Sequence, residues 1–285
     1  MTQHILALET SGIRCGVAVL CAAGDGRTDL FAAHHDGAQT HAEHMLPLVS
    51  SVLARAGVSR TDLDAVAFGA GPGGFTGLRV ACGVAQGIAL ALDLPVLAVG
   101  THDAVADSLS RDGATSVVAV AMDARMGEVY AALFVLPAGS AQPSGPGVPD
   151  IDMSQPAPYR LSGPVLLSAA DLAPWLREAR ARALAHLRTA GQDGEAVRWV
   201  LAGDAWSLPG MAVPDAWRRD PLALSPGAGA VARLGGLALA RGEGQDPAQA
   251  QPIYVRDKVA FTTAERAGGL GGNPKAAPPD AGDRA

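Results

Sequence analysis

The segment that most constrains this chain is its glycine-rich run, Gly69–Arg79, with the sequence Gly-Ala-Gly-Pro-Gly-Gly-Phe-Thr-Gly-Leu-Arg. An apolar run at Asp64–Gly69 leads into it, and a stretch of small residues at Thr76–Leu92 follows it. The pattern predicts a buried strand, a tight turn and a helix. A strand at Pro95–Val99 and a helix at His102–Ser110 come next. Strands that alternate with helices in this way favour an α/β fold with parallel pairing.

The glycine run has two interpretations. Glycines let backbones approach closely, and the free N–H groups at the start of a helix suit an anion, so one interpretation is a phosphate site. A P-loop requires Lys followed by Ser or Thr after its last glycine, but Leu78 and Arg79 stand there. Gly69, Gly71 and Gly74 match the spacing of the dinucleotide fingerprint, without its usual acidic partner at the end of the next strand. We favour the other interpretation, in which the glycines allow tight packing.

The helix predicted after the turn is apolar on nearly every side. Gly83 and Gly87 are four residues apart and share a face, which Ala81 and Ala85 broaden. Such a helix is expected to be buried on every side, with one face on the sheet. The other face needs a cover, and we predict that the helix Thr40–Ala56 and a partner chain supply it.

The helix predicted at Thr40–Ala56 carries its own start signal. Thr40 and Glu43 have the spacing of a capping box, and Pro47 is expected either to kink the helix or to set the start of its regular part. Its apolar stripe consists of Met45, Leu48, Val49 and Val52. The helix is therefore predicted to pack through this stripe.

The rest of the chain predicts two related α/β halves. The remaining strands are expected at His4–Thr10, Cys15–Ala22, Leu30–His35, Ser116–Met122, Val129–Leu136 and Val197–Ala202, and the remaining helices at Ala169–Leu187 and Ser225–Arg241. We predict a first half from 1–105 plus about 223–262, and a second half from 106–222. The second half has a Pro/Gly-rich insertion at 137–164, which we expect to be a loop, and the tail at 263–285 is expected to be disordered.

Composition narrows the class of protein. The 285 residues are 48% hydrophobic and carry a formal net charge of −6, without the basic surplus of a free-standing nucleic-acid binder. Three scattered cysteines indicate a reducing compartment. The N-terminus lacks signal-peptide features, and the apolar stretch Val80–Leu92 is judged too short to span a membrane. We expect a cytoplasmic protein.

Several motifs, in order, resemble the TsaB (YeaZ) family. The segments that carry the resemblance are Gly69–Arg79, Ile5–Val19, His41–Pro47, Met122–Arg125 followed by Gly127–Tyr130, and Pro252–Arg256. Together they span about residues 4–262. The resemblance implies a duplicated actin-like (ASKHA, ribonuclease H-like) fold with two α/β subdomains. It also implies a role in adding a threonylcarbamoyl group to the adenosine beside the anticodon of tRNAs that read codons starting with A.

In that family the chain is a non-catalytic scaffold that activates a TsaD-type catalytic subunit. The resemblance implies pairing through the two helices that flank the glycine turn, with a TsaE-type ATPase joining the pair and a TsaC-type enzyme supplying threonylcarbamoyl-adenylate. ATP and a divalent metal are expected on the partners, with no cofactor bound firmly here, and tRNA contact is expected only through the complex. The isolated chain is expected to form a homodimer. The expected interface residues are His44, Met45, Leu48, Val52, Phe75, Leu78, Arg79, Ala81, Gly83, Ala85 and Gly87.

The alternative is an enzyme acting alone, either a metal-dependent glycoprotease-like peptidase or an actin-like ATPase. His41 and His44 are three residues apart, whereas a helical metal pair more often has a spacing of four, so we interpret them as surface or interface residues. No Gly-x-Ser-x-Gly nucleophile motif is present. The candidates for weak nucleotide contact, by their positions in the actin-like pattern, are Glu9, Asp123, Gly203 and Asp204.

Overall fold

The computed structural model describes residues 2–256 except 25–26, 38–39, 110, 112, 140–151, 193–196, 209–210, 212–213 and 222. Met1–Ile253 forms one compact unit, and a second unit begins at Tyr254. The predicted tail at 263–285 therefore lies outside the described residues. The described residues of the second unit, Tyr254–Arg256, are neither helix nor strand.

The first sheet has the strand order β3-β2-β1-β4-β5. Its strands are β1 (Gln3–Glu9), β2 (Arg14–Ala22), β3 (Thr28–Asp36), β4 (Ala65–Gly71) and β5 (Val96–Gly100). The first three are antiparallel, whereas β4 and β5 run parallel to β1. The central strand β1 is covered on both faces, and its middle residues Ile5–Leu8 are apolar and fully buried.

The second sheet repeats this plan. Its strands are β6 (Ser116–Arg125), β7 (Glu128–Leu136), β8 (Tyr159–Ser168), β9 (Arg198–Ala202) and β10 (Arg218–Arg219), in the order β10-β9-β6-β7-β8. Again the first three strands are antiparallel and the last two are parallel to the first. The two halves therefore confirm the predicted duplicated actin-like fold, with a mixed five-stranded sheet in each half.

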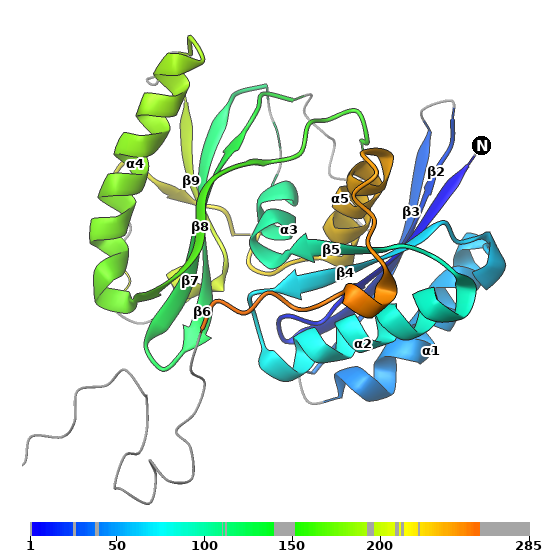
Figure 1. Cartoon of the computed structure of the whole chain (residues 1–285). Coiled ribbons are helices and arrows are strands. Elements are labelled where there is room, and N and C mark those ends of the chain that lie inside the picture. The colour runs from blue at the N-terminus through cyan, green and yellow to red at the C-terminus, as the bar shows by residue number, and fades with distance from the viewer. Residues whose placement is uncertain are drawn as a thin grey trace, which may run out of the picture. The chain divides into compact units, whose positions relative to one another are not determined.

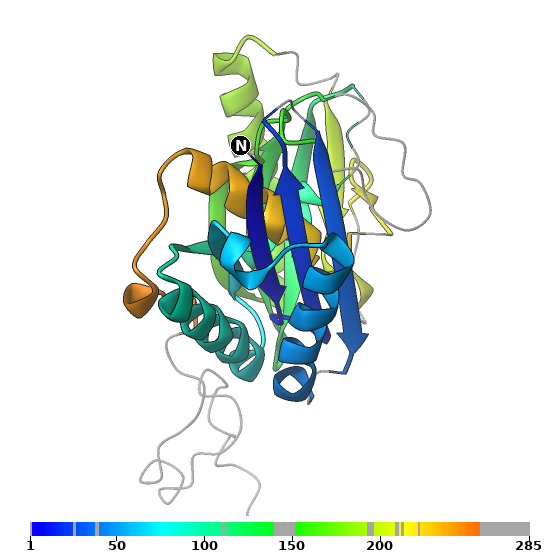
Figure 2. The ribbon, with the colours of Figure 1, turned by 90° about the vertical axis from the view of Figure 1, so that its right-hand side faces the viewer.

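Five α-helices cover the sheets in the described residues (Figures 1 and 2). They are α1 (His41–Ala56), α2 (Phe75–Leu92), α3 (Thr101–Asp107), α4 (Leu172–Thr189) and α5 (Ala228–Ala240), with short 3₁₀ turns at η1 (Arg60–Asp62), η2 (Ala169–Asp171), η3 (Asp204–Ser207) and η4 (Pro247–Gln249). Helices α1 and α2 share a core with one face of the first sheet, and α5 packs on its other face. Helix α4 covers one face of the second sheet, and α3 contacts strands of both sheets.

A buried ion pair ties α5 to α3. Arg233 Nη1 donates to Asp107 Oδ1 at 2.6 Å, and Arg233 Nε donates to the Asp152 carbonyl at 3.0 Å. Arg111 joins the cluster by donating to the Pro156 carbonyl at 2.7 Å. These contacts hold the end of the insertion against helices that belong to the first sheet and to the crossover between the two sheets.

Two local predictions are wrong. Thr40 precedes α1 but makes no side-chain cap, because its hydroxyl donates to the Gly37 carbonyl at 3.2 Å. The insertion predicted as a loop at 137–164 contains the first residues of β8, although 140–151 lie outside the described residues. The Pro- and Gly-rich composition predicted that this loop continues through Gly163-Pro164. Among the described strands, however, β8 is an edge strand beside β7, and an edge strand tolerates a proline that cannot donate a ladder hydrogen bond.

Helix α2 also corrects the sequence analysis. Its 18 residues have a mean hydropathy of 1.5, so by length and composition alone it is able to cross a membrane. Core helices pass the same test, and the inward face of α2 packs on β4 and β1. Only 33% of its residues are buried inside the chain. A long and strongly apolar helix is therefore left with an open outward face.

Candidate partner-binding face and nucleotide-contact residues

The outward faces of α1 and α2 lie side by side on one side of the first sheet (Figures 1 and 2). Gly83 and Gly87 face open space, since a Cβ added to either would meet no atom within 4 Å. Leu90 on the same helix is 59% exposed, and Leu46 on α1 is 55% exposed. The face is smooth along the glycines and apolar at its sides, which is typical of a protein interaction surface.

The N-terminal end of this face is aromatic and cationic. Phe75 is 45% exposed, and the Arg79 guanidinium lies 3.4 Å from the centre of its ring. A cation above a ring is favourable and also covers part of the apolar surface. Phe75, Arg79, Gly83 and Gly87 follow one another at helical spacing, so the structure brings these predicted interface residues together on one line of α2.

Five of the predicted interface residues do not belong to this face. They are Met45, Val52, Leu78, Ala81 and Ala85, all of which are fully or almost fully buried inside the chain. The prediction selected the most apolar positions, and these are the positions that pack on the sheet. His44 and Leu48 are only partly buried and lie at the margin of the face. Leu90 was missed, although its spacing of three from Gly87 and seven from Gly83 placed it there.

The glycine run packs on the turn that follows β1. The Gly74 N–H donates to the Ser11 carbonyl at 2.7 Å, and the Thr10 hydroxyl donates to the Gly77 carbonyl at 2.7 Å. A Cβ on Gly77 would overlap the Thr10 carbonyl oxygen, and one on Gly73 would lie 2.6 Å from the Ser11 oxygen. These glycines therefore serve close packing between backbones.

Glu9 lies buried at the end of β1, directly against the glycine run. Its Oε1 accepts the Ser11 N–H at 2.5 Å, and its Oε2 has no hydrogen-bond partner among the described residues. A Cβ on Gly69 would overlap that Oε2. Burial raises the pKa of Glu9 to about 7. The buried Glu9 carboxyl thus lies directly beside Gly69, at the start of the glycine run.

The other candidates for nucleotide contact lie in the second half. The Asp123 N–H donates to Asp204 Oδ1 at 2.8 Å, which brings the ends of β6 and β9 together. Arg125 binds both Asp123 oxygens, through its backbone N–H at 2.7 Å and its Nη1 at 2.8 Å. Burial raises the pKa of Asp204, and the hydrogen bond from the Asp123 N–H opposes this rise. Asp123, Gly203 and Asp204 are therefore neighbours, whereas Glu9 belongs to the other sheet.

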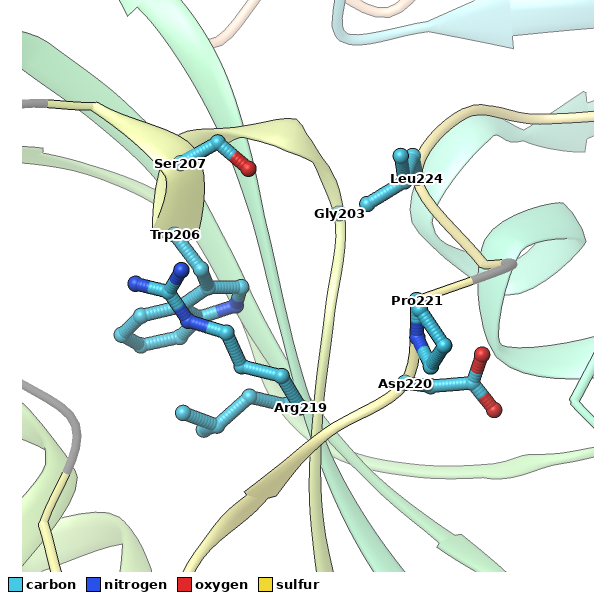
Figure 3. Close-up of a pocket in the computed structure, with 8 residues that line it drawn as sticks. Gly203, Trp206, Ser207, Arg219, Asp220, Pro221 and Leu224 are labelled. Carbon is cyan, nitrogen blue, oxygen red and sulfur yellow. The ribbon is translucent and has the colours of Figure 1, made fainter.

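A pocket of about 240 Å³ opens beside Gly203 (Figure 3). It is lined by Leu201, Gly203, Trp206, Ser207, Arg219, Asp220, Pro221 and Leu224. Figure 3 shows the Trp206 and Arg219 side chains on one side of the pocket and those of Pro221 and Leu224 on the other. Gly203 has a φ of +97° and a Cβ there would overlap the Ala121 carbonyl, so this glycine is required for packing. Nucleotide contact at this site stays a prediction.

The histidines have structural partners. His41 is buried, with Nε2 3.5 Å from the Ile13 carbonyl, so its interpretation as a surface or interface residue is wrong. His44 is partly buried and stacks on His35 with ring centres 3.6 Å apart. His102 is buried with Nε2 3.0 Å from the Tyr130 carbonyl, and burial lowers its pKa to about 4. Across the parts of the chain that the structure describes, no three His, Cys, Asp or Glu side chains are placed to hold a metal ion.

Comparison with known proteins decides the family. The chain is 32% identical to the tRNA threonylcarbamoyladenosine biosynthesis protein TsaB of Escherichia coli over 267 residues, covering 91% of this chain and 97% of that protein. The chain belongs to the TsaB family. This confirms the resemblance that the five motifs carried.

Solved structures agree with the TsaB assignment. YeaZ from Pseudomonas aeruginosa is 32% identical with a TM-score of 0.62, and the match covers 88% of this chain and 99% of that one. A second structure from Pseudomonas aeruginosa, described as an uncharacterized protein with similarity to peptidase YeaZ, is 33% identical with a TM-score of 0.64 and covers 89% and 100%. The family model for TsaD, tRNA N6-adenosine threonylcarbamoyltransferase, matches residues 35–141, which include α1 and α2.

The packing of the glycine run gives a matched pair of substitutions on one helix. We expect Gly77→Ala to lower the free energy of unfolding by about 2 kcal/mol or more, because the new methyl group overlaps the Thr10 carbonyl. Gly83→Ala meets open space and is expected to stabilise α2 by up to about 1 kcal/mol. Chemical denaturation measures both values, and equal effects from the two changes would contradict this account of the turn.

The buried Glu9 gives a pH prediction. Its pKa is higher in the folded chain than in the unfolded one, so its contribution to stability is full below about pH 4.5 and is lost as the pH rises through about 7. From pH 5 to pH 8, the wild type should lose on the order of 3 kcal/mol of unfolding free energy relative to Glu9→Gln. The difference between the two proteins cancels the opposite effect of His102, whose lowered pKa removes stability as the pH falls.

The control for Glu9 is Glu178→Gln on the exposed face of α4. Its unfolding free energy should run parallel to that of the wild type across the same pH range. A Glu9→Gln curve that also runs parallel to the wild type would show that Glu9 is ionised in the folded protein throughout, against its buried position.

Proposed function

We propose that this chain is the non-catalytic subunit that activates a TsaD-type threonylcarbamoyl transferase in the cytoplasm. The reaction transfers a threonylcarbamoyl group to the adenosine beside the anticodon of tRNAs that read codons starting with A. The observation that carries the proposal is α2, a helix with a mean hydropathy of 1.5 of which only a third is buried inside its own chain. A face of this kind needs a partner to cover it.

Membership of the TsaB family supports a role in tRNA modification, and the outward face of α1 and α2 supports pairing with a TsaD-type subunit. The Escherichia coli relative is a tRNA threonylcarbamoyladenosine biosynthesis protein by name. The TsaD family model matches the segment that contains α1 and α2, so a TsaD-type partner is expected to carry a related helix pair. Two related helix pairs can meet face to face around a pseudo-two-fold axis, with the flat line of Gly83 and Gly87 allowing close approach.

ATP and a divalent metal belong to the partner subunits in this proposal. The groups of this chain that suggested such chemistry already have roles in its own packing. At the turn after β1, the Gly74 N–H donates to the Ser11 carbonyl and Glu9 Oε1 accepts the Ser11 N–H. In the second half, Arg125 binds both oxygens of Asp123. A TsaE-type ATPase and a TsaC-type enzyme complete the pathway.

The decisive variant enlarges the two open glycines. Gly83→Leu/Gly87→Leu adds side chains whose Cβ atoms meet no atom of this chain within 4 Å, so folding should be retained while a facing helix is held away. Gly227→Leu is the matched control, since its added Cβ also meets open space and it precedes α5 on another face. A charge introduced at Ala85 does not test the face, because Ala85 is fully buried and Ala85→Glu would unfold the protein.

We expect the double variant to bind a TsaD-type subunit at least tenfold more weakly and no longer to co-elute with it. It should also abolish tRNA modification in a reconstituted reaction with the TsaC, TsaD and TsaE types. The control should retain both. The same change should make the isolated chain monomeric if it forms a homodimer through this face. Retained pairing by the folded double variant would rule out the face.

The competing proposal is an enzyme acting alone. It requires stoichiometric metal in the purified chain or ATP hydrolysis without partners, and a loss of that activity in His41→Ala/His44→Ala. Elemental analysis and an ATPase assay of the isolated protein separate the two proposals.

A further inference from the structure

Helix α4 carries a local positive charge on an acidic protein. Over Leu172–Thr189 it has four arginines and one glutamate, a formal charge of +3, whereas the whole chain carries −6. The arginines are Arg177, Arg180, Arg182 and Arg188, and all four are exposed. No described residue forms an ion pair with any of them. The helix was predicted at Ala169–Leu187, but the net charge of the whole chain does not reveal its local positive charge.

The packing of α4 on the second sheet leaves these arginines on the exposed side of the helix. The helix packs on the second sheet through Leu172, Leu176, Ala179, Ala183 and Leu187, which are buried. Arg177 and Arg188 are three helical turns apart on the same side, about 16 Å along the axis. The Arg180 guanidinium lies 5.2 Å from the centre of the Trp199 ring, and Trp199 packs edge-on against Trp217. Beyond Trp217, the strand β10 adds the exposed Arg218 and Arg219.

An aromatic pair borders the other side of the helix. Tyr159 at the start of β8 is 56% exposed and stacks on His186 of α4, with ring centres 5.0 Å apart and ring planes at 16°. Arg182 is one turn before His186. Exposed rings beside arginines offer a surface on which an unstacked base can lie, while guanidinium groups bind phosphates through paired hydrogen bonds.

We propose that the arginine face of α4, with Tyr159 at its edge, binds the phosphate backbone of RNA. Charge complementarity favours a polyanion over an acidic surface patch because the arginines extend over several turns. A membrane fits less well, since a helix that lies in a lipid interface needs large apolar side chains beside its basic ones. On α4 these side chains are buried (Leu172, Leu176 and Leu187) or partly buried against the same core (Trp175 and Leu184). Resting on the proposed function, the RNA is the tRNA that the complex modifies.

The position of α4 keeps this face available in a complex. Helix α4 covers one face of the second sheet and α3 contacts the same sheet from the first half, whereas α1 and α2 pack on the first sheet (Figure 1). A partner seated on α1 and α2 therefore engages a different sheet from the one that carries α4. The chain would add a basic surface to the assembly from its second half.

The test is Arg177→Gln/Arg182→Gln/Arg188→Gln in the full chain, with Arg180 kept because it packs on Trp199. The control, Arg14→Gln/Arg60→Gln/Arg241→Gln, removes the same number of charges elsewhere; Arg14 and Arg241 are paired with Asp36 and Glu243. The probe is a fluorescently labelled, unmodified tRNA transcript that reads a codon starting with A. Its affinity is measured by anisotropy between 50 and 200 mM KCl, for the complex with a TsaD-type subunit and for the chain alone.

We expect the α4 variant to weaken tRNA binding about tenfold at 100 mM KCl and to lower the slope of log affinity against log salt by about 2–3. The control should stay within about twofold of the wild type. Equal affinity and slope for the α4 variant and the wild type, with thermal melting showing that both are folded, would overturn the proposal. So would an α4 variant that loses binding only to phosphatidylserine vesicles.

The two proposals fail separately. If no complex forms with the TsaD-type subunit but the chain alone binds the transcript through the α4 arginines, the pairing is wrong and the RNA surface stands. If the complex forms and modifies tRNA with unchanged affinity in the α4 variant, the pairing stands and the RNA surface is wrong.

Discussion

The close fit between the glycine run and the turn after β1 fixes how the rest of the first half is used. Gly77 approaches the Thr10 carbonyl with no room for a side chain, and the Gly74 N–H holds the Ser11 carbonyl at 2.7 Å. These contacts set the start of α2 against the end of β1. Toward the other end of α2, Gln86 donates to the Pro247 and Ala250 carbonyls, and these hydrogen bonds fix the rotation of the helix. Because α2 cannot turn, one particular face remains outward.

The fold was predictable because its signals are local. Continuous apolar strands, the glycine turn and helical spacing gave the order of nearly every element, and the duplicated plan followed from the motifs. The failures were also local. The segment around Gly163-Pro164 was predicted as a loop, but it is part of the edge strand β8, where a proline is tolerated. Thr40 matched a capping pattern, but its hydroxyl donates to the Gly37 carbonyl. In both cases a contact decided the local structure against the sequence pattern: the pairing of β8 with β7, and the hydrogen bond from Thr40 to Gly37.

The outward face of α2 was harder to predict, because a helix that is apolar all round does not reveal which side its own sheet covers. Hydrophobicity pointed to Met45, Leu78 and Ala85, which the sheet covers. The open side is marked by Gly83 and Gly87 instead, residues that contribute little to a hydrophobic stripe. Small residues at a spacing of four are informative when a helix already has another apolar face for the core, since they then serve a second packing surface.

The net charge of the chain did not predict the basic helix α4, for a related reason. A sum over all residues does not describe the charge of one surface. Folding places the apolar residues of α4 on the second sheet and leaves four arginines outside, so a protein with a formal charge of −6 presents a helix of charge +3. Over a Debye length of about 8 Å at physiological salt, a polyanion responds to this helix and not to the distant acidic residues. The two halves of the duplicated fold thus expose different surfaces: the outward face of α2 is apolar along Gly83, Gly87 and Leu90, and the exposed side of α4 is cationic. The first suits the proposed contact with a protein, and the second suits the proposed contact with a phosphate backbone.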